Sequence, residues 1–323
     1  MKILTWIKPS SDQIHLWNYF WAVKQLLDLQ KDKNNLIYFM IADLHALTTI
    51  KEQHLDYKRA ILNQAKIYLA LWIDTNNVKL FRQHKIPAHT ELNWILSCIT
   101  NFNTLRRMHA FKDAYEKGNV DKVSAWLFNY PTLMAADILL YNVDAVPVWQ
   151  DQKQHLEHAQ ELAKIFNSMF WEFFKVPKSL INERIAKIPW IDWRKMSKSY
   201  NNFIWILDDE NTLFKKINQI KIEVTEFKNK NYDELTIFKL LKLFTNEKNY
   251  DKIKNDLLNN KINIKTVKEI LFNKINEQLK PIRNKFNTIL DKDIIDILEE
   301  NEKKLNEEAN KNIKNIYKLI KLD

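Results

Sequence analysis

The sequence predicts an α/β protein in which a parallel sheet wrapped by helices is followed by an all-helical C-terminal part. Up to about Leu207, short apolar segments alternate with amphipathic helical segments, as they do in βαβ units. After that residue the strand signal almost disappears and charged helical patterns continue to the end. The 323 residues, 46% of them hydrophobic, therefore suit two domains, which we expect at 1–205 and 206–323.

The chain opens with a strand at 2–7 (KILTWI), a polar loop at 8–13 and a helix over about 14–30. This order begins a nucleotide-binding α/β unit. A second strand at 35–43 is apolar on both faces, as buried parallel strands are. Further strands are expected at 78–81 and 144–149, and further helices at 56–71, 88–102, 133–141, 234–244, 266–286 and 294–320.

Charge and hydropathy restrict the partners that the chain can have. A net charge of +10 and a pI of about 9.3 favour polyanions such as RNA, although a lysine-rich composition by itself is weak support for binding. No apolar run reaches the ~18 residues of a membrane span, and no basic leader with an apolar stretch begins the chain. We therefore expect a cytoplasmic protein without a membrane partner.

Cysteine and histidine give little support for a metal centre. The single cysteine, Cys98, lies in an apolar helical pattern and is expected to be a buried thiol. His155 and His158 are three residues apart on one helix, and we interpret them as solvated helix positions rather than metal ligands. No protein-bound metal is expected.

Two polar strings can serve a nucleotide. Lys195, Met196, Ser197, Lys198 and Ser199 place two ammonium groups and two hydroxyls on a polar loop, which can surround a triphosphate and stabilise the charge of departing pyrophosphate; the alternative is a solvated basic loop. The string HLWN begins the first helix, where free N–H groups and the helix dipole favour phosphate. Together the strings flank one candidate nucleotide site.

Their order and separation resemble the HIGH and KMSKS motifs of class I aminoacyl-tRNA synthetases. Further strings resemble the bacterial tryptophanyl-tRNA synthetases: IADLHALTT, HTELNWILSCITNF, NYPTLMAADILLYNVDAVPVWQDQKQHLE and IDWRKMSKSYNN. The resemblance is close over about the first 210 residues and limited to helical character beyond them. It implies a Rossmann-like catalytic domain and a helical domain that reads the tRNA anticodon.

The resemblance also implies the site residues. Asp137 matches the carboxylate that accepts the indole N–H of tryptophan, which is suitable chemistry because a buried donor demands an acceptor. The other tryptophan-binding positions are His45, Tyr130, Met134, Val146, Val148 and Gln152; plain core packing is the alternative for Met134 and the valines. Catalysis is assigned to His15, Asn18, Lys195 and Lys198. The ATP-binding positions are Lys8, Pro9, Ser10, Trp17, Asn18, Trp149, Gln150, Asp151, Ile188, Lys195, Met196, Ser197, Lys198 and Ser199.

By the same resemblance, the enzyme joins L-tryptophan to ATP as tryptophanyl-adenylate and transfers the aminoacyl group to tRNA(Trp). No protein nucleophile is needed, because positioning and charge stabilisation do the work, with Mg²⁺ accompanying ATP. A homodimer is expected. The alternatives are a tyrosyl-type class I synthetase and a non-catalytic RNA-binding paralogue.

Glycine usage is anomalous, since the chain has one glycine, Gly118, and eleven tryptophans. Nine of the tryptophans fall where the family has glycine: Trp6, Trp17, Trp21, Trp72, Trp126, Trp149, Trp171, Trp190 and Trp193. Trp94 falls on a family tryptophan. We infer that UGA codons meaning glycine were translated as tryptophan; the alternative is real core or RNA-stacking tryptophans. Ser11 and Leu4 also depart from the family pattern.

Overall fold

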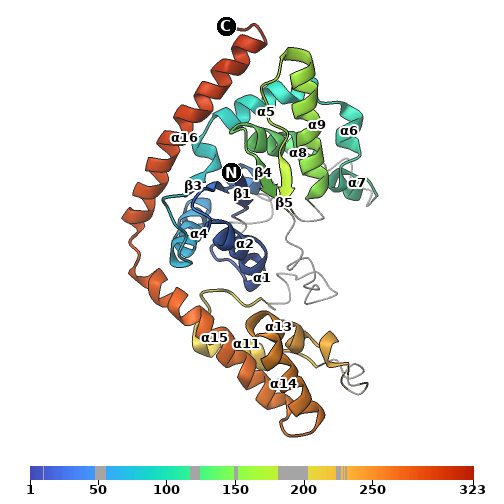
Figure 1. Cartoon of the computed structure of the whole chain (residues 1–323), viewed down its shortest axis with the longest axis vertical. Helices are drawn as coiled ribbons and strands as arrows, with labels where there is room; N and C mark the ends of the chain where they lie inside the picture. Colours follow the sequence, from blue (N-terminus) through green and yellow to red (C-terminus); the bar gives the residue numbers. More distant parts are fainter. Residues whose placement is uncertain are drawn as a thin grey trace. The chain divides into compact units, whose positions relative to one another are not determined.

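The computed structural model in Figure 1 describes residues 1–9, 11–47, 56–116, 124–148, 152–180, 203–222, 227, 229 and 231–323. They belong to two compact units. The first unit comprises Met1–Asp12, Ala22–Asn182 and Leu290–Asp323, and the second comprises Gln13–Trp21 and Glu183–Ile289. Within the described ranges, no helix combines the length and the apolarity needed to cross a membrane.

The first unit is built on a five-stranded parallel sheet with the strand order β3-β2-β1-β4-β5. Its strands are β1 Lys2–Ile7, β2 Leu36–Ile41, β3 Val78–Arg82, β4 Ala145–Pro147 and β5 Lys178–Leu180. The parallel α/β architecture and the four predicted strands are confirmed. Strand order reverses between β1 and β4, and in such sheets ligands bind beyond the carboxyl ends of the two strands at that switch point.

The first unit also contains nine described helices, among them those expected at 56–71, 88–102, 133–141 and 294–320, while the short α3, α6 and α7 were not predicted (Figure 1). The nine helices are α2 Lys24–Leu29, α3 Asp43–Ala46, α4 Tyr57–Ala70, α5 Ala88–Ile99, α6 Phe102–Arg106, α7 His109–Glu116, α8 Ala125–Leu139, α9 Lys153–Phe170 and α16 Asp291–Leu319. The helix expected over 14–30 is interrupted: α1 Leu16–Asn18 leads into a π-helical turn at Tyr19–Val23 before α2. Single π-turns of this kind are frequent at functional sites.

Helix α16 covers the edge strand β3 of the first unit. Asn301 donates from Nδ2 to the carbonyl oxygen of Leu80 at 3.0 Å, and both oxygens of Glu302 accept from the Arg82 guanidinium at 2.6 Å. An uncovered edge strand would offer unpaired backbone groups to other chains. The apolar stripe of α16 completes the burial with Leu305, Ala309, Ile313 and Ile316.

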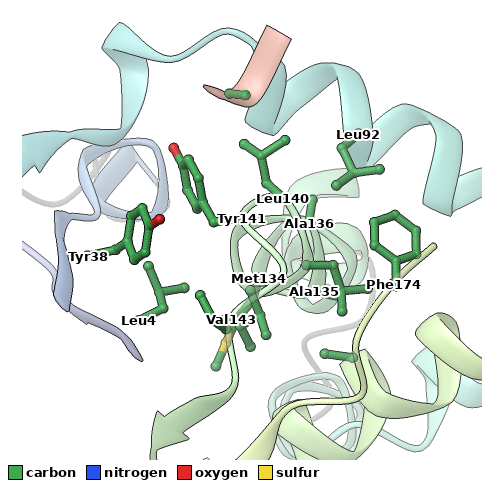
Figure 2. Close-up of a cluster of buried hydrophobic side chains, with 14 of the residues drawn as sticks. Leu4, Tyr38, Leu92, Met134, Ala135, Ala136, Leu140, Tyr141, Val143 and Phe174 are labelled. Atoms are coloured by element: carbon green, nitrogen blue, oxygen red, sulfur yellow. The ribbon is translucent and has the colours of Figure 1, made fainter. Parts of the chain in front are cut away.

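The core between β1, β2, α5 and α8 surrounds the segment that follows Met134 (Figure 2). Tyr38 and Tyr141 stack at a centroid distance of 4.8 Å, and the Tyr38 hydroxyl donates to Glu308 of α16. Every residue from Met134 to Tyr141 is buried, including the charged Asp137. A charged side chain in such surroundings requires polar partners.

The expectation of a buried Cys98 is wrong, because the thiol is exposed on α5. The buried face of α5 carries Ala88, His89, Leu92 and Leu96. Cys98 lies two residues after Leu96, about 200° around the helix, and therefore faces away from the core.

Two tryptophans occupy backbone conformations that favour glycine. After α4, the Trp72 N–H donates to Leu69 O at 3.1 Å and the Ile73 N–H to Tyr68 O at 3.4 Å, which is the Schellman pattern with Trp72 in the position usual for glycine. Its φ is 58°. Trp171 ends α9 with φ 95° and ψ 157°, a region occupied almost only by glycine.

The second unit is helical. It contains α1 and the helices α11 Glu210–Asn218, α13 Thr236–Phe244, α14 Glu247–Leu258 and α15 Ile264–Thr288. Helix α15 buries a stripe at four-residue spacing, Val267, Leu271, Ile275 and Leu279, and packs against α11 and α13. The helical character predicted for the C-terminal part is confirmed.

Candidate functional site

A buried carboxylate, Asp137, is the centre of the polar site in the first unit. It is 1% exposed and lies against polar side chains of three other elements. His45 Nε2 on α3 lies 2.8 Å from Oδ2, and Gln83 Nε2, in the turn after β3, lies 2.8 Å from Oδ1 and 3.0 Å from Oδ2. His89 Nδ1 on α5 lies 2.7 Å from Oδ1. The sheet thus brings together groups that are far apart in the sequence.

These donors keep Asp137 ionised. Burial by itself would raise the pKa of this carboxyl, but hydrogen bonds and charge interactions with His45 and His89 outweigh burial and bring its pKa below the ordinary value. The result is a negative acceptor inside an apolar helix. Such a group suits a ligand that presents an N–H or O–H donor in a dry pocket.

Tyr130 lies on the same face of α8 as Asp137, seven residues earlier. Its ring lies edge-on to His45 at 6.4 Å, and its hydroxyl is 3.0 Å from Nε2 of His155 on α9. Burial raises the pKa of Tyr130 to about 12, so the phenol stays neutral. An aromatic wall beside a buried carboxylate can hold a flat ring that carries a donor.

The other positions assigned to the amino-acid pocket have mixed surroundings. Met134, Val146 and Val148 belong to the apolar core cluster, which is consistent with plain packing as well as with lining a pocket. Gln152 is partly buried at the start of α9. Val146 lies within β4 and Val148 directly follows it, and β4 is one of the two strands at the switch point of the sheet.

Both histidines singled out on α9 are buried, at 5% exposure for His155 and 3% for His158, so the expectation of solvated positions is wrong. They continue the buried face that carries Leu162 and Phe166. Burial lowers the pKa of His158 to about 4, with a contribution from nearby His155. Among the described residues, no group of three or more His, Cys, Asp or Glu side chains is arranged to hold a metal ion.

The first nucleotide string lies in the second unit. His15 precedes α1, and its Nδ1 accepts from the Asn18 N–H at 3.2 Å. The ring stacks on Phe203 at 5.3 Å, and burial lowers its pKa to about 4. A neutral imidazole whose Nδ1 accepts carries its proton on Nε2, and Nε2 can donate to a phosphate oxygen.

His15 is joined to the chain that follows the second nucleotide string. It forms an antiparallel bridge with Trp205; Leu16 N donates to Ile204 O at 2.9 Å and Ile206 N to Ile14 O at 3.1 Å. Residues 195–199 lie outside the described residues, as do Ser10, Trp149, Gln150, Asp151, Ile188, Trp190 and Trp193, and the side chains of Trp17 and Trp21 are not described either. Lys8 and Pro9 directly follow β1 at the switch point.

Gln83 and His89 were missed by the sequence analysis. A signal was present, since Gln83 directly follows β3 and polar side chains at the carboxyl ends of parallel strands often face ligands. His89 stands within the buried stripe of α5, where an apolar residue would otherwise be expected.

Known proteins share this architecture and sequence over most of the chain. The family model described as tRNA synthetases class I (W and Y) matches residues 1–314. A tryptophan–tRNA ligase from Campylobacter jejuni is 36% identical over 325 residues, which cover 100% of both chains. One from Corynebacterium glutamicum is 45% identical over 221 residues, 67% of this chain and 63% of that protein.

A crystal structure of the Campylobacter jejuni tryptophanyl-tRNA synthetase complexed with ADP and tryptophan superposes with a TM-score of 0.85, at 34% identity and with 99% of each chain covered. The shared sheet, the helical C-terminal part and the matched sequence agree. The chain therefore belongs to the class I tRNA synthetases for tryptophan and tyrosine.

Proposed function

We propose that the chain is a tryptophan–tRNA ligase, which activates L-tryptophan with ATP and transfers it to tRNA(Trp). The observation that carries this proposal is the buried, ionised Asp137, held by His45, Gln83 and His89 beside the Tyr130 ring. An indole presents one N–H donor, which a buried carboxylate can accept. A competing substrate ring without a donor would leave the carboxylate without that hydrogen bond. The full-length relative that is 36% identical bears this activity in its name.

The reaction that we propose has two steps. The carboxylate of tryptophan attacks the α-phosphate of ATP, pyrophosphate leaves, and the terminal ribose hydroxyl of the tRNA then attacks the adenylate carbonyl and releases AMP. His15 and Asn18 contact the phosphates, while Lys195 and Lys198 stabilise the charge on the departing pyrophosphate, together with Mg²⁺ carried by ATP. The bridge from His15 to Trp205, six residues after Ser199, supports placing both strings at one nucleotide.

We propose that catalysis and tRNA recognition are carried by successive parts of the sequence. Residues 1–205 form the catalytic domain and residues 206–323 include the surface that reads the tRNA anticodon. Because α16 is packed on β3, the helices α11 to α15 are the candidates for anticodon contacts. Their lysines would add salt-dependent affinity for RNA. We place the enzyme in the cytoplasm.

A homodimer is supported by aromatic side chains that the first unit leaves exposed. Trp94 is 74% exposed on α5, Phe102 is 62% exposed on α6, and Tyr115 is 61% exposed on α7. Each of these helices contacts α8, so the exposed aromatic groups belong to one part of the unit. Apolar surface of this kind commonly marks an interface between proteins.

We further propose that the nine tryptophans at family glycine positions are glycines in the protein that the cell makes, because UGA is read there as glycine. Trp72 occupies the glycine position of a Schellman motif, and Trp171 has a φ of 95° that suits glycine almost alone. Peptide mass spectrometry of the native protein tests this. Masses that fit tryptophan at 72 and 171 would exclude it, and masses that fit glycine are the expected result.

Amino-acid-dependent exchange of pyrophosphate into ATP tests the activity, with the nine positions returned to glycine. We expect exchange with L-tryptophan and not with L-tyrosine. Exchange with tyrosine would identify the tyrosyl-type alternative. A folded protein that binds tRNA but supports no exchange would identify the non-catalytic paralogue. The same chain with tryptophan kept at 17 and 149 is the matched control, since indoles there would obstruct the approach of ATP to the backbone.

A further inference from the structure

We propose that Gln83 and His89 are positioning residues for amino-acid selection, which hold the Asp137 carboxylate so that one acceptor site remains directed to the donor of the substrate ring. This inference rests on the proposed function, in which Asp137 accepts the indole N–H. Neither residue needs to touch the substrate. Their role is to set the orientation of the group that does.

The hydrogen bonds on the carboxylate leave room for one more. An ionised carboxylate has about four acceptor positions. Oδ1 accepts from Gln83 Nε2 at 2.8 Å and lies 2.7 Å from His89 Nδ1 in an ion-pair contact, while Oδ2 lies 2.8 Å from His45 Nε2 and has only the longer contact with Gln83, at 3.0 Å. Oδ1 is therefore occupied by Gln83 and His89. The remaining capacity is on Oδ2, the oxygen on the side of His45 and, beyond it, Tyr130.

Gln83 is locked in the orientation that makes it a donor to Asp137. It is fully buried, and its Oε1 accepts from the backbone N–H of Leu44 at 3.2 Å. Because the amide oxygen is engaged there, the NH₂ group faces the carboxylate. Leu44 directly precedes His45 on α3, so one side chain links the helix that carries His45 to Asp137.

His89 is fixed in an equivalent way. It is fully buried, its ring stacks on Phe81 at a centroid distance of 6.1 Å, and Nε2 lies 3.0 Å from the Tyr141 hydroxyl. The Tyr141 hydroxyl is the hydrogen-bond partner of Nε2, and Nδ1 lies 2.7 Å from Oδ1 of Asp137 as its ion-pair partner. The imidazole is therefore held against one oxygen of the carboxylate.

A plain structural role makes a different prediction. Any buried carboxylate needs donors, and losing one would weaken the fold and reduce the use of every substrate alike. A positioning role reduces only the preference for a substrate ring that has an N–H donor. A matched pair of amino acids separates the two roles: L-tryptophan and L-β-(3-benzothienyl)alanine, in which sulfur replaces the indole N–H at nearly the same ring size.

The experiment measures kcat/KM for both amino acids by pyrophosphate exchange in the glycine-restored chain. Gln83→Met and His89→Leu each remove one polar partner of the carboxylate, whereas His89→Asn keeps an amide N–H near the place of Nδ1. We expect Gln83→Met and His89→Leu to lower kcat/KM for tryptophan about 10- to 100-fold, as loss of an outer partner of a site group does. The value for the benzothienyl analogue and the KM for ATP should stay nearly unchanged. His89→Asn should recover most of the loss.

Two further variants serve as controls. Asn77→Met removes a buried amide at the other end of β3, where its Nδ2 donates to Gln30 O at 3.1 Å, and should leave the preference between the two amino acids intact. Asp137→Asn should abolish that preference. If Asp137→Asn leaves it intact, the proposed role of Asp137 fails. If Asp137→Asn abolishes it while Gln83→Met and His89→Leu lower both substrates equally, the function stands and the positioning role is overturned.

Discussion

The backbone conformation of Trp171 predicts that glycine at this position gives a more stable protein than alanine, which is the reverse of the usual order. Trp171 ends α9 with φ 95° and ψ 157°, and its side chain is 81% exposed. A residue with a Cβ held in this region costs about 1–3 kcal/mol, and glycine removes that cost while losing about 0.4–1 kcal/mol through the freedom of its unfolded chain. We expect Trp171→Gly to be more stable than Trp171→Ala by about 1–2 kcal/mol.

Comparing glycine with alanine at the same position cancels the packing lost with the indole. Trp94 is the matched control, because it is also exposed, lies inside α5 and falls on a family tryptophan. There the order should reverse, with alanine more stable than glycine by about 1 kcal/mol, as in any exposed helix interior. Urea unfolding of the four variants measures both differences. Alanine equal to or better than glycine at 171 would refute the reasoning.

Three other results follow from the geometry. Glu302→Leu should cost about 3–5 kcal/mol by leaving the nearly buried Arg82 unpaired, and adding Arg82→Met should recover most of that loss in thermal denaturation. Because burial lowers the His158 pKa to about 4, the unfolded chain binds a proton first as pH falls below about 6.5; stability should drop by about 3 kcal/mol between these pH values. His158→Leu should flatten that part of the pH–stability curve, and an unchanged slope would contradict it. Lys195→Ala combined with Lys198→Ala should lower kcat for exchange about 100-fold or more with little change in the KM for tryptophan, as rapid kinetics can show.

Periodicity in the sequence predicted most of the fold because the strands of the central sheet are nearly continuous apolar runs. Strand β2 is the clearest case, since five of its six residues are buried. Strand β5 was missed because KSL at 178–180 is short and two of its residues are exposed. The sequence also showed that the last helix is amphipathic, but an apolar stripe does not tell which surface it covers. The contacts of α16 in the structure, such as those of Asn301 and Glu302 with β3, show that the helix belongs to the first unit.

The candidate site was predicted in part. The family strings indicated Asp137, His45 and Tyr130, and these side chains do lie together. Gln83 and His89 could not be found from local patterns because they are 54 and 48 residues from Asp137 in the chain and meet it only through the sheet. The exposure of single side chains was harder to predict from residue type. His155 and His158 are polar residues on a buried helix face, and Cys98 is an apolar residue on an exposed helix face.

Charging of a tRNA(Trp) transcript with labelled amino acid tests the account most directly. The protein should carry glycine at the nine positions and be folded by circular dichroism. We predict ATP-dependent transfer of L-tryptophan to the transcript, with no comparable charging of L-tyrosine on tRNA(Tyr), and loss of that transfer in Asp137→Asn. A folded protein that charges tyrosine instead, or that charges tryptophan equally well without the Asp137 carboxylate, would contradict the account.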